Sequence, residues 1–305
     1  MTEQQLAVRL QRTIPSPPNR VYRAWLEPEF VRQWMAPGEF RTTQVEIDER
    51  VGGRYSIRHT RAGQVVGGFE AEILELIPDR RIVWRWGFVG AEGINGPVYD
   101  STLTVTFADA PGGATQLSLV HERLDTLAAA LPEVARNVRA GWEDVLRKLA
   151  AAQVLADPVA QELLHSPLLM RMAYTGTDGF PRVVPIGYLW NGTDFVVCTT
   201  PNAPKVRALQ KDPRVALTID TDSMPPHVLL VRGTASLELV EGVPPEYLLA
   251  SKKAVPEAQW RSFEAQVRGL YKQMVRICVR PIWAKVLDFE TRLPQAVEEL
   301  VRSAS

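Results

Sequence analysis

Residues 68–84 have the sequence Gly68-Phe-Glu-Ala-Glu-Ile-Leu-Glu-Leu-Ile-Pro-Asp-Arg-Arg-Ile-Val-Trp84. Apolar and polar side chains largely alternate up to Ile77, which is typical of a strand with one buried face. Pro78 and Asp79 form a turn signal, and a second strand-like run begins at Arg81. This segment predicts an antiparallel hairpin, the centre of a larger sheet.

Runs of the same kind lie on both sides of this hairpin. The predicted strands of the first half cover residues 6–13, 42–48, 54–60, 65–77, 81–88, 102–107 and 115–122. Two short helices, separated near Pro28, precede the sheet, and a long helix with one apolar stripe runs from Pro132 to about Ala152. This order predicts a sheet wrapped around one helix, with a cavity between them.

The second half begins with a new helix start at Asp157-Pro158, so we predict domains over residues 1–153 and 157–303. Thr177-Asp178-Gly179 and Asn191-Gly192 are hairpin signals, since these residues tolerate a positive φ. The predicted strands cover residues 168–175, 183–190, 194–200, 215–220, 227–239 and 275–289. The predicted helices cover residues 158–165, 204–211, 245–253, 257–274 and 294–302.

The composition of the chain disfavours several classes of protein. The chain has 305 residues, with 35 basic and 35 acidic side chains. This balance disfavours a sequence-independent nucleic-acid binder, which needs a basic face. Cys198 and Cys278 lie far apart in sequence, so neither a disulfide framework nor a zinc site is predicted, and neither thiol has a neighbouring base to activate it. With no signal-like or membrane-spanning apolar run, the expected location is the cytoplasm.

Several motifs of the first half carry a resemblance. They are Trp25, Trp34, Asp48-Glu-Arg-Val-Gly-Gly-Arg-Tyr55, residues 68–84, Gly113-Ala-Thr and Gly141-Trp142. Over residues 8–152 the chain resembles the START-like superfamily known as SRPBCC, and within it the activator of heat-shock-protein-90 ATPase homologue family. The resemblance implies a helix-grip fold. Five side chains could line its hydrophobic-ligand cavity or serve as ordinary core: His59, Trp84, Trp86, His121 and Trp142.

The second half contains a candidate phosphate site. Thr199 and Thr200 end a predicted strand, and Lys205 follows at the start of a predicted helix. Two hydroxyl groups, one ammonium and the backbone N–H groups of a helix N-terminus together suit a phosphate. Arg207 and Lys211 lie nearby in sequence and could add positive charge.

This region also resembles a family, over residues 157–289. Asp178-Gly-Phe-Pro-Arg-Val-Val-Pro-Ile186, Thr199-Thr200, Lys205 and Asp212-Pro-Arg-Val-Ala-Leu217 resemble the pyridoxamine 5′-phosphate oxidase-like split-barrel family. The resemblance implies a homodimer that binds flavin mononucleotide (FMN) or a deazaflavin coenzyme at its interface. It places the phosphate on Thr199, Thr200 and Lys205, and the ring along Arg182, Val183, Val184, Pro185 and Ile186. Ala203 stands where the family often has Ser, which removes one hydroxyl.

These resemblances suggest two functions. The first is a flavin- or deazaflavin-dependent oxidoreductase with a fused START-like domain, acting on a small hydrophobic ligand or electron acceptor. The alternative is a non-enzymatic ligand-binding or chaperone and stress-response protein, in which the split barrel is a dimerisation scaffold. Trp283, near the last strand, could cover the cofactor ring or pack in the core. The sequence identifies no catalytic residue and no metal site.

Overall fold

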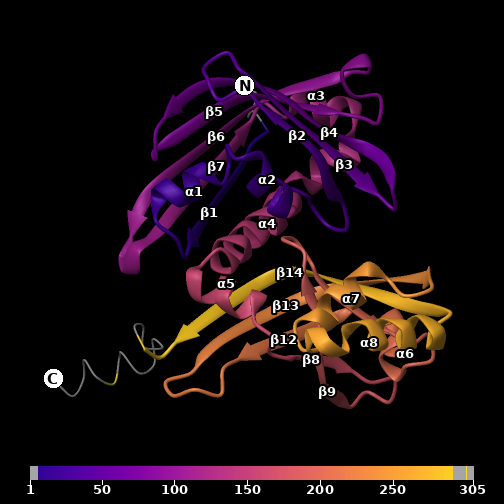
Figure 1. The fold of residues 1–305 in the computed structure, drawn as a ribbon. Helices are drawn as coiled ribbons and strands as arrows, with labels where there is room; N and C mark the ends of the chain where they lie inside the picture. The colour runs from indigo at the N-terminus through magenta and orange to yellow at the C-terminus, as the bar shows by residue number, and fades with distance from the viewer. Residues whose placement is uncertain (1–5, 291–299, 301–305) are drawn as a thin grey trace. The chain divides into compact units, whose positions relative to one another are not determined.

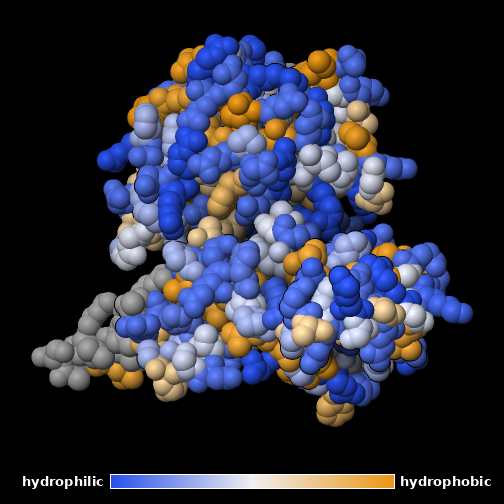
Figure 2. Space-filling model, viewed as in Figure 1, coloured by the Kyte–Doolittle hydropathy of each residue, from blue (hydrophilic) through white to orange (hydrophobic). Residues whose placement is uncertain are grey.

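The computed structural model describes residues 6–290 and residue 300, so the helix predicted over residues 294–302 lies outside the described part. The chain divides into two compact units, Met1–Gln153 and Val154–Ser305. Within the described residues, eight α-helices accompany fourteen strands, which form two antiparallel seven-stranded sheets (Figure 1). The predicted two-domain α+β class is confirmed. The face of the molecule drawn in Figure 2 is mostly hydrophilic, with apolar residues scattered over it.

The N-terminal unit contains a sheet of strand order β1-β7-β6-β5-β4-β3-β2. Strands β2 to β7 form a meander, and β1 closes it by pairing with β7. The strands are β1 (Val8–Ile14), β2 (Arg41–Ile47), β3 (Arg54–Arg61), β4 (Gln64–Ile77), β5 (Arg81–Val89), β6 (Val98–Ala110) and β7 (Ala114–Glu122). The helices are α1 (Pro18–Arg23), α2 (Pro28–Trp34), α3 (Asp125–Ala130) and α4 (Pro132–Leu155), with 3₁₀ turns at Gly93–Asn95 and Pro111–Gly113.

The segment 68–84 forms the predicted hairpin between β4 and β5. Its turn contains Asp79 with φ of +59°, a conformation that Asp tolerates better than most residues. The register places Phe69 opposite Phe88 and Ile73 opposite Trp84, so the apolar side chains of both strands share one face. This face supplies one wall of the core.

A cluster of aromatic side chains forms the centre of that core. Trp25, Trp34, Trp84 and Trp86 are all fully buried. The α4 residues Trp142, Val145, Leu146 and Leu149 belong to the same cluster, so α4 packs against the apolar face of the sheet (Figure 1). The predicted arrangement of a sheet around one helix therefore describes this unit.

The C-terminal unit contains a sheet of strand order β10-β11-β14-β13-β12-β8-β9. Its strands are β8 (Met170–Thr175), β9 (Pro181–Ile186), β10 (Leu189–Trp190), β11 (Phe195–Thr199), β12 (Arg214–Asp220), β13 (His227–Glu241) and β14 (Gln273–Asp288). Its helices are α5 (Pro158–His165), α6 (Pro204–Lys211), α7 (Pro245–Lys252) and α8 (Glu257–Leu270). Helix α6 has the predicted bounds.

Three elements differ from the sequence prediction. The single strand predicted over 183–190 is two strands, β9 and β10, at opposite edges of the sheet. Tyr188 lies at the break; it is buried, and its hydroxyl donates to the carbonyl of Leu163 over 2.8 Å. The helix predicted to reach residue 274 ends at Leu270, because Met274 is buried and pairs with Val240 in the sheet. Helix α3 was not predicted.

Within the described residues, none of the helices has both the length and the apolar character needed to cross a membrane.

Candidate functional sites

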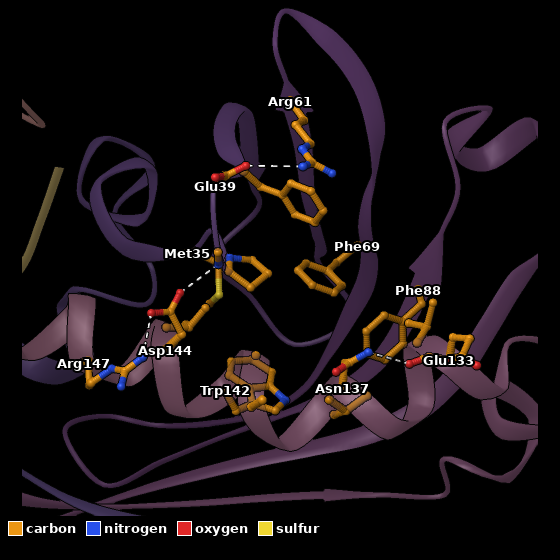
Figure 3. Close-up of a pocket in the computed structure, with 18 residues that line it drawn as sticks. Met35, Glu39, Arg61, Phe69, Phe88, Glu133, Asn137, Trp142, Asp144 and Arg147 are labelled. Atoms are coloured by element: carbon orange, nitrogen blue, oxygen red, sulfur yellow. Dashed lines mark hydrogen bonds and ion pairs between the residues drawn. The ribbon is translucent and has the colours of Figure 1, made fainter. Parts of the chain in front are cut away.

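The N-terminal unit contains a cavity of about 770 Å³ between α4, the loop that follows α2, and strands β3 to β5. Its aromatic lining residues come from three parts of the unit. Phe40 belongs to the loop, whereas Phe69 and Phe88 come from the sheet and Trp142 comes from α4 (Figure 3). This volume is within the usual range for a small-molecule site. The cavity can therefore hold a ligand of several rings.

Charged side chains surround the cavity, and each has an opposite charge beside it. Glu39 pairs with Arg61 at 3.3 Å (Figure 3). Asp144 accepts from Arg147 at 3.0 Å, from the buried Lys148 at 2.9 Å and from the N–H of Gly38 at 2.8 Å. Burial alone would raise the pKa of Asp144, but these hydrogen bonds and the positive charges outweigh it and hold the pKa below its usual value.

Only one of the five residues predicted to line the cavity is among the residues that line it. Trp142 is at its wall, whereas Trp84, Trp86, His59 and His121 are not. Their inward orientation agrees with the strand alternation, but other rings cover Trp86, His59 and His121. Phe69 lies 4.7 Å from Trp86, and Phe88 stacks on His121 at 5.6 Å between ring centroids.

Sequence reasoning missed the residues of that covering layer. Phe69 and Phe88 continue the same inward alternation toward the ends of β4 and β5, so the pattern Trp84-x-Trp86-x-Phe88 contains the signal. Phe40 lies in a loop after α2, where no periodic pattern identifies an inward-facing residue.

His121 connects the cavity wall to the core through a chain of hydrogen bonds. The indole N–H of Trp142 donates to Nδ1 of His121 over 2.9 Å. Nδ1 is therefore an acceptor, and in a neutral imidazole the proton is on Nε2, which lies 2.7 Å from the hydroxyl of Ser101. That hydroxyl donates to the carbonyl of Trp86 over 2.7 Å. Burial lowers the pKa of His121 to about 3, so the ring is neutral at pH 7.

His59 is the second buried histidine of this unit. Its Nδ1 lies 3.4 Å from the hydroxyl of Thr42, which donates to the carbonyl of Met35. Its Nε2 is buried and has no hydrogen-bond partner among the residues that the structure describes. Burial, followed by the positive charges of Lys148 and Arg58, lowers the pKa of His59 to about 4. Both histidines are thus neutral core residues in the native state at pH 7.

In the C-terminal unit, the structure brings together two of the predicted phosphate ligands. Thr199 is the last residue of β11, and Lys205 is the second residue of α6. Between them the N–H of Ala203 donates a hydrogen bond to the carbonyl of Thr200 over 3.1 Å, which closes a turn. As a result, Nζ of Lys205 lies 3.5 Å from the hydroxyl of Thr199.

This end of α6 fits an anion. Helix α6 starts at Ala203-Pro204, and within the described part of the chain no side chain caps its N-terminus. Lys205 is half-buried, and burial lowers the pKa of its ammonium. An anion held between the helix end and Lys205 would oppose that effect. The residues present therefore suit a phosphate group, although Ala203 contributes no hydroxyl.

The predicted ring-binding strand β9 is an edge strand that pairs with β8. Val183 is 63% exposed, and Pro181 and Pro185 are exposed prolines, which an edge strand tolerates. Arg182 forms a surface ion pair with Asp178 at 2.6 Å. Helix α6, which carries Lys205, contacts β8, the neighbour of β9.

Cys198 and Trp283 lie in surroundings that define what each side chain can do. Burial raises the pKa of Cys198 to about 12, so this thiol is protonated at neutral pH and is a poor nucleophile. The guanidinium of Arg232 lies over the ring of Trp283, 4.6 Å from its centroid. Trp283 therefore has a partner within its own sheet.

Two family models match different parts of the chain. Residues 15–153 match the family model described as Activator of Hsp90 ATPase homolog 1-like protein, and residues 156–274 match the model described as Pyridoxamine 5′-phosphate oxidase. The two halves of the chain thus resemble these two families. The chain pairs a ligand-binding type of domain with a flavin-binding type of split barrel, as the resemblances implied.

Several solved structures are similar to about half of the chain. Protein CV1439 from Chromobacterium violaceum is 35% identical, with 47% of this chain and 94% of that chain covered and a TM-score of 0.40. Protein NE0264 from Nitrosomonas europaea is 22% identical, with coverage of 48% and 92% and a TM-score of 0.40. Protein Ms6760 from Mycobacterium smegmatis is 22% identical, with coverage of 50% and 91% and a TM-score of 0.41. No curated protein matches the chain.

Proposed function

We propose that the protein is a flavin- or deazaflavin-dependent oxidoreductase whose N-terminal unit holds a small apolar molecule. The observation that carries this proposal is the half-buried Lys205 beside Thr199 at the uncapped start of α6. It occurs in a domain whose family commonly binds flavin. We expect the protein to work in the cytoplasm.

The residues of the split barrel would bind and orient the cofactor. Lys205 would neutralise the phosphate, and Thr199 and Thr200 would donate hydroxyl hydrogen bonds to it. The open edge of β9 would present backbone groups of residues 182–186 to the polar side of the ring. When bound, a flavin or deazaflavin supplies the hydride-transfer chemistry, while the protein supplies position and electrostatics.

We further propose that the split barrel forms a homodimer, as related folds often do. The apolar side chains at and beside β9 support this. Phe180 is 68% exposed and Val183 is 63% exposed in the single chain. A partner molecule would bury them, which favours association. Sedimentation equilibrium at micromolar concentration tests this part, and a stable monomer would refute it.

A cofactor titration tests the main proposal. The purified chain is titrated with FMN and, separately, with a deazaflavin coenzyme, and cofactor fluorescence is followed. We expect saturation near one cofactor per chain for one of them. Lys205→Ala should weaken that binding at least about tenfold, because a charge-assisted hydrogen bond is lost. Lys285→Ala, at an exposed position of β14 ten residues from Val275, the partner of Thr199, should leave it unchanged.

The cavity supports a second candidate function, in which the protein binds ligands without redox chemistry or contacts a chaperone or stress-response partner. In that case the split barrel serves as a scaffold. Failure of both cofactors to bind, together with ligand uptake by the N-terminal unit, would favour this second function over the first.

A further inference from the structure

We propose that the N-terminal cavity takes an uncharged aromatic molecule of two to four rings, which it holds against Trp142. This inference rests on the ligand-binding half of the proposed function and is independent of the cofactor. It specifies the chemical class of the ligand from the walls, the charges and the hydrogen bonds of the cavity.

The wall offers ring surfaces on several sides. Phe40, Phe69, Phe88 and Trp142 all line the same space (Figure 3). Aromatic rings at centroid separations of about 4.5–7 Å attract one another beyond the effect of area burial. A flat aromatic ligand can make such contacts with several of these rings at once, whereas an aliphatic chain cannot.

Trp142 contributes ring contacts only. Its N–H donates to His121, and His121 is held in turn by Ser101. The indole is therefore fixed in place and has no hydrogen left to donate to a ligand. This makes His121 a positioning residue for the wall, although it does not line the cavity itself.

The charges around the cavity are already compensated. Asp144 accepts hydrogen bonds from Arg147 and Lys148, and Glu39 pairs with Arg61. An ionic ligand would have to break such a pair or lose its own hydration without a partner, and both are unfavourable. An uncharged ligand meets neither obstacle, so the cavity should discriminate against a charged version of the same ring system.

Two fluorescent probes with the same ring system separate these cases. N-phenyl-1-naphthylamine is uncharged, and 8-anilino-1-naphthalenesulfonate adds one sulfonate to it. We expect the uncharged probe to bind the full-length chain saturably, near one per chain, and the sulfonate to bind at least about tenfold more weakly. 1-Dodecanol, an uncharged aliphatic competitor, should displace the probe only at much higher concentration.

Site variants locate the probe. Gly141 lines the cavity, and a Cβ added there would meet its nearest atom, Cβ of Pro37, at an ordinary 3.8 Å. Gly141→Trp should therefore fold and place an indole in the cavity, with binding weakened at least about tenfold. Gly141→Leu serves as a milder second variant. Glu143→Trp, on an exposed position of the same helix that does not line the cavity, is the matched control and should bind like the unchanged protein.

Each outcome has a defined meaning. Equal binding of the two naphthalene probes would overturn the uncharged class, and effective competition by dodecanol would overturn the aromatic class. Unchanged binding in a folded Gly141→Trp variant would overturn the location. No binding of any probe would refute ligand binding by this unit, while leaving the cofactor titration of the split barrel unaffected.

Discussion

The buried histidines make the N-terminal unit sensitive to acid. The pKa of His121 is lowered to about 3 by burial, whereas an unfolded histidine titrates near 6.5. Between these two values the unfolded state binds more protons than the native state. The free energy of unfolding therefore falls as the pH is lowered through this window, and the contribution of His121 is fully retained above about pH 6.5.

The size of the effect follows from the same two values. At pH 5 the solution lies about 1.5 units below the unfolded pKa and well above the native one. Each pH unit corresponds to about 1.4 kcal/mol per proton. Protonation of His121 in the unfolded state therefore lowers the free energy of unfolding by about 2 kcal/mol at pH 5 relative to pH 8. His59, whose pKa is lowered to about 4, further decreases the free energy of unfolding at pH 5 for the same reason.

His121→Gln isolates this contribution. Glutamine does not titrate, and its amide can accept from Trp142 and donate to Ser101, the two partners of the imidazole. Urea unfolding is measured at pH 8 and pH 5 by tryptophan fluorescence, to which five of the eight tryptophans contribute from the N-terminal unit. Between pH 8 and pH 5, we expect the free energy of unfolding to decrease by about 2 kcal/mol less in the variant than in the unchanged protein.

An identical pH dependence of the two proteins would refute the reasoning, since it would mean that His121 takes up no proton on unfolding. Other titrating groups change the stability of both proteins equally and cancel in the comparison. If His121→Gln lowers stability at pH 8, the difference between pH 8 and pH 5 still reports the proton linkage. His59→Asn gives an independent repeat at the second histidine.

Three further predictions follow from particular contacts. Gly141→Ala should raise the free energy of unfolding by about 1 kcal/mol, because alanine is the better helix former and the added Cβ has room; a lower melting temperature would contradict this. Tyr188→Phe should lower the stability of the C-terminal unit by about 1 kcal/mol in urea unfolding, because the buried hydrogen bond to the carbonyl of Leu163 is lost while the hydroxyl of Ser166 still donates to that carbonyl. Lys205→Ala should weaken cofactor binding while leaving the melting temperature nearly unchanged, since Lys205 is only half-buried and makes one long hydrogen bond; equal affinity in the variant would contradict the phosphate assignment.

Local patterns predicted most of the elements, because alternation and turn chemistry act over a few residues. The hairpin over 68–84 and helix α6 are examples, since each has its own start and stop signals. The break at Tyr188 could not be predicted in this way. It depends on the hydroxyl reaching Leu163, which is 25 residues away in sequence. The end of α8 likewise depends on the pairing of Met274 with Val240.

The candidate cavity shows a second limit of prediction from sequence, which concerns how far each inward-facing side chain lies from the cavity. Alternation along a strand tells which face a side chain occupies, and it correctly places Trp84, Trp86 and His121 on the inner face. It does not tell how many layers of side chains lie between that face and a cavity. Here Phe69, Phe88 and Trp142 form the layer at the cavity, and Trp86 and His121 support it from behind. A buried histidine next to a cavity can therefore act by holding a wall residue in place, and His121 does so through the indole N–H of Trp142. Variants of such supporting residues should alter ligand affinity through the position of the wall.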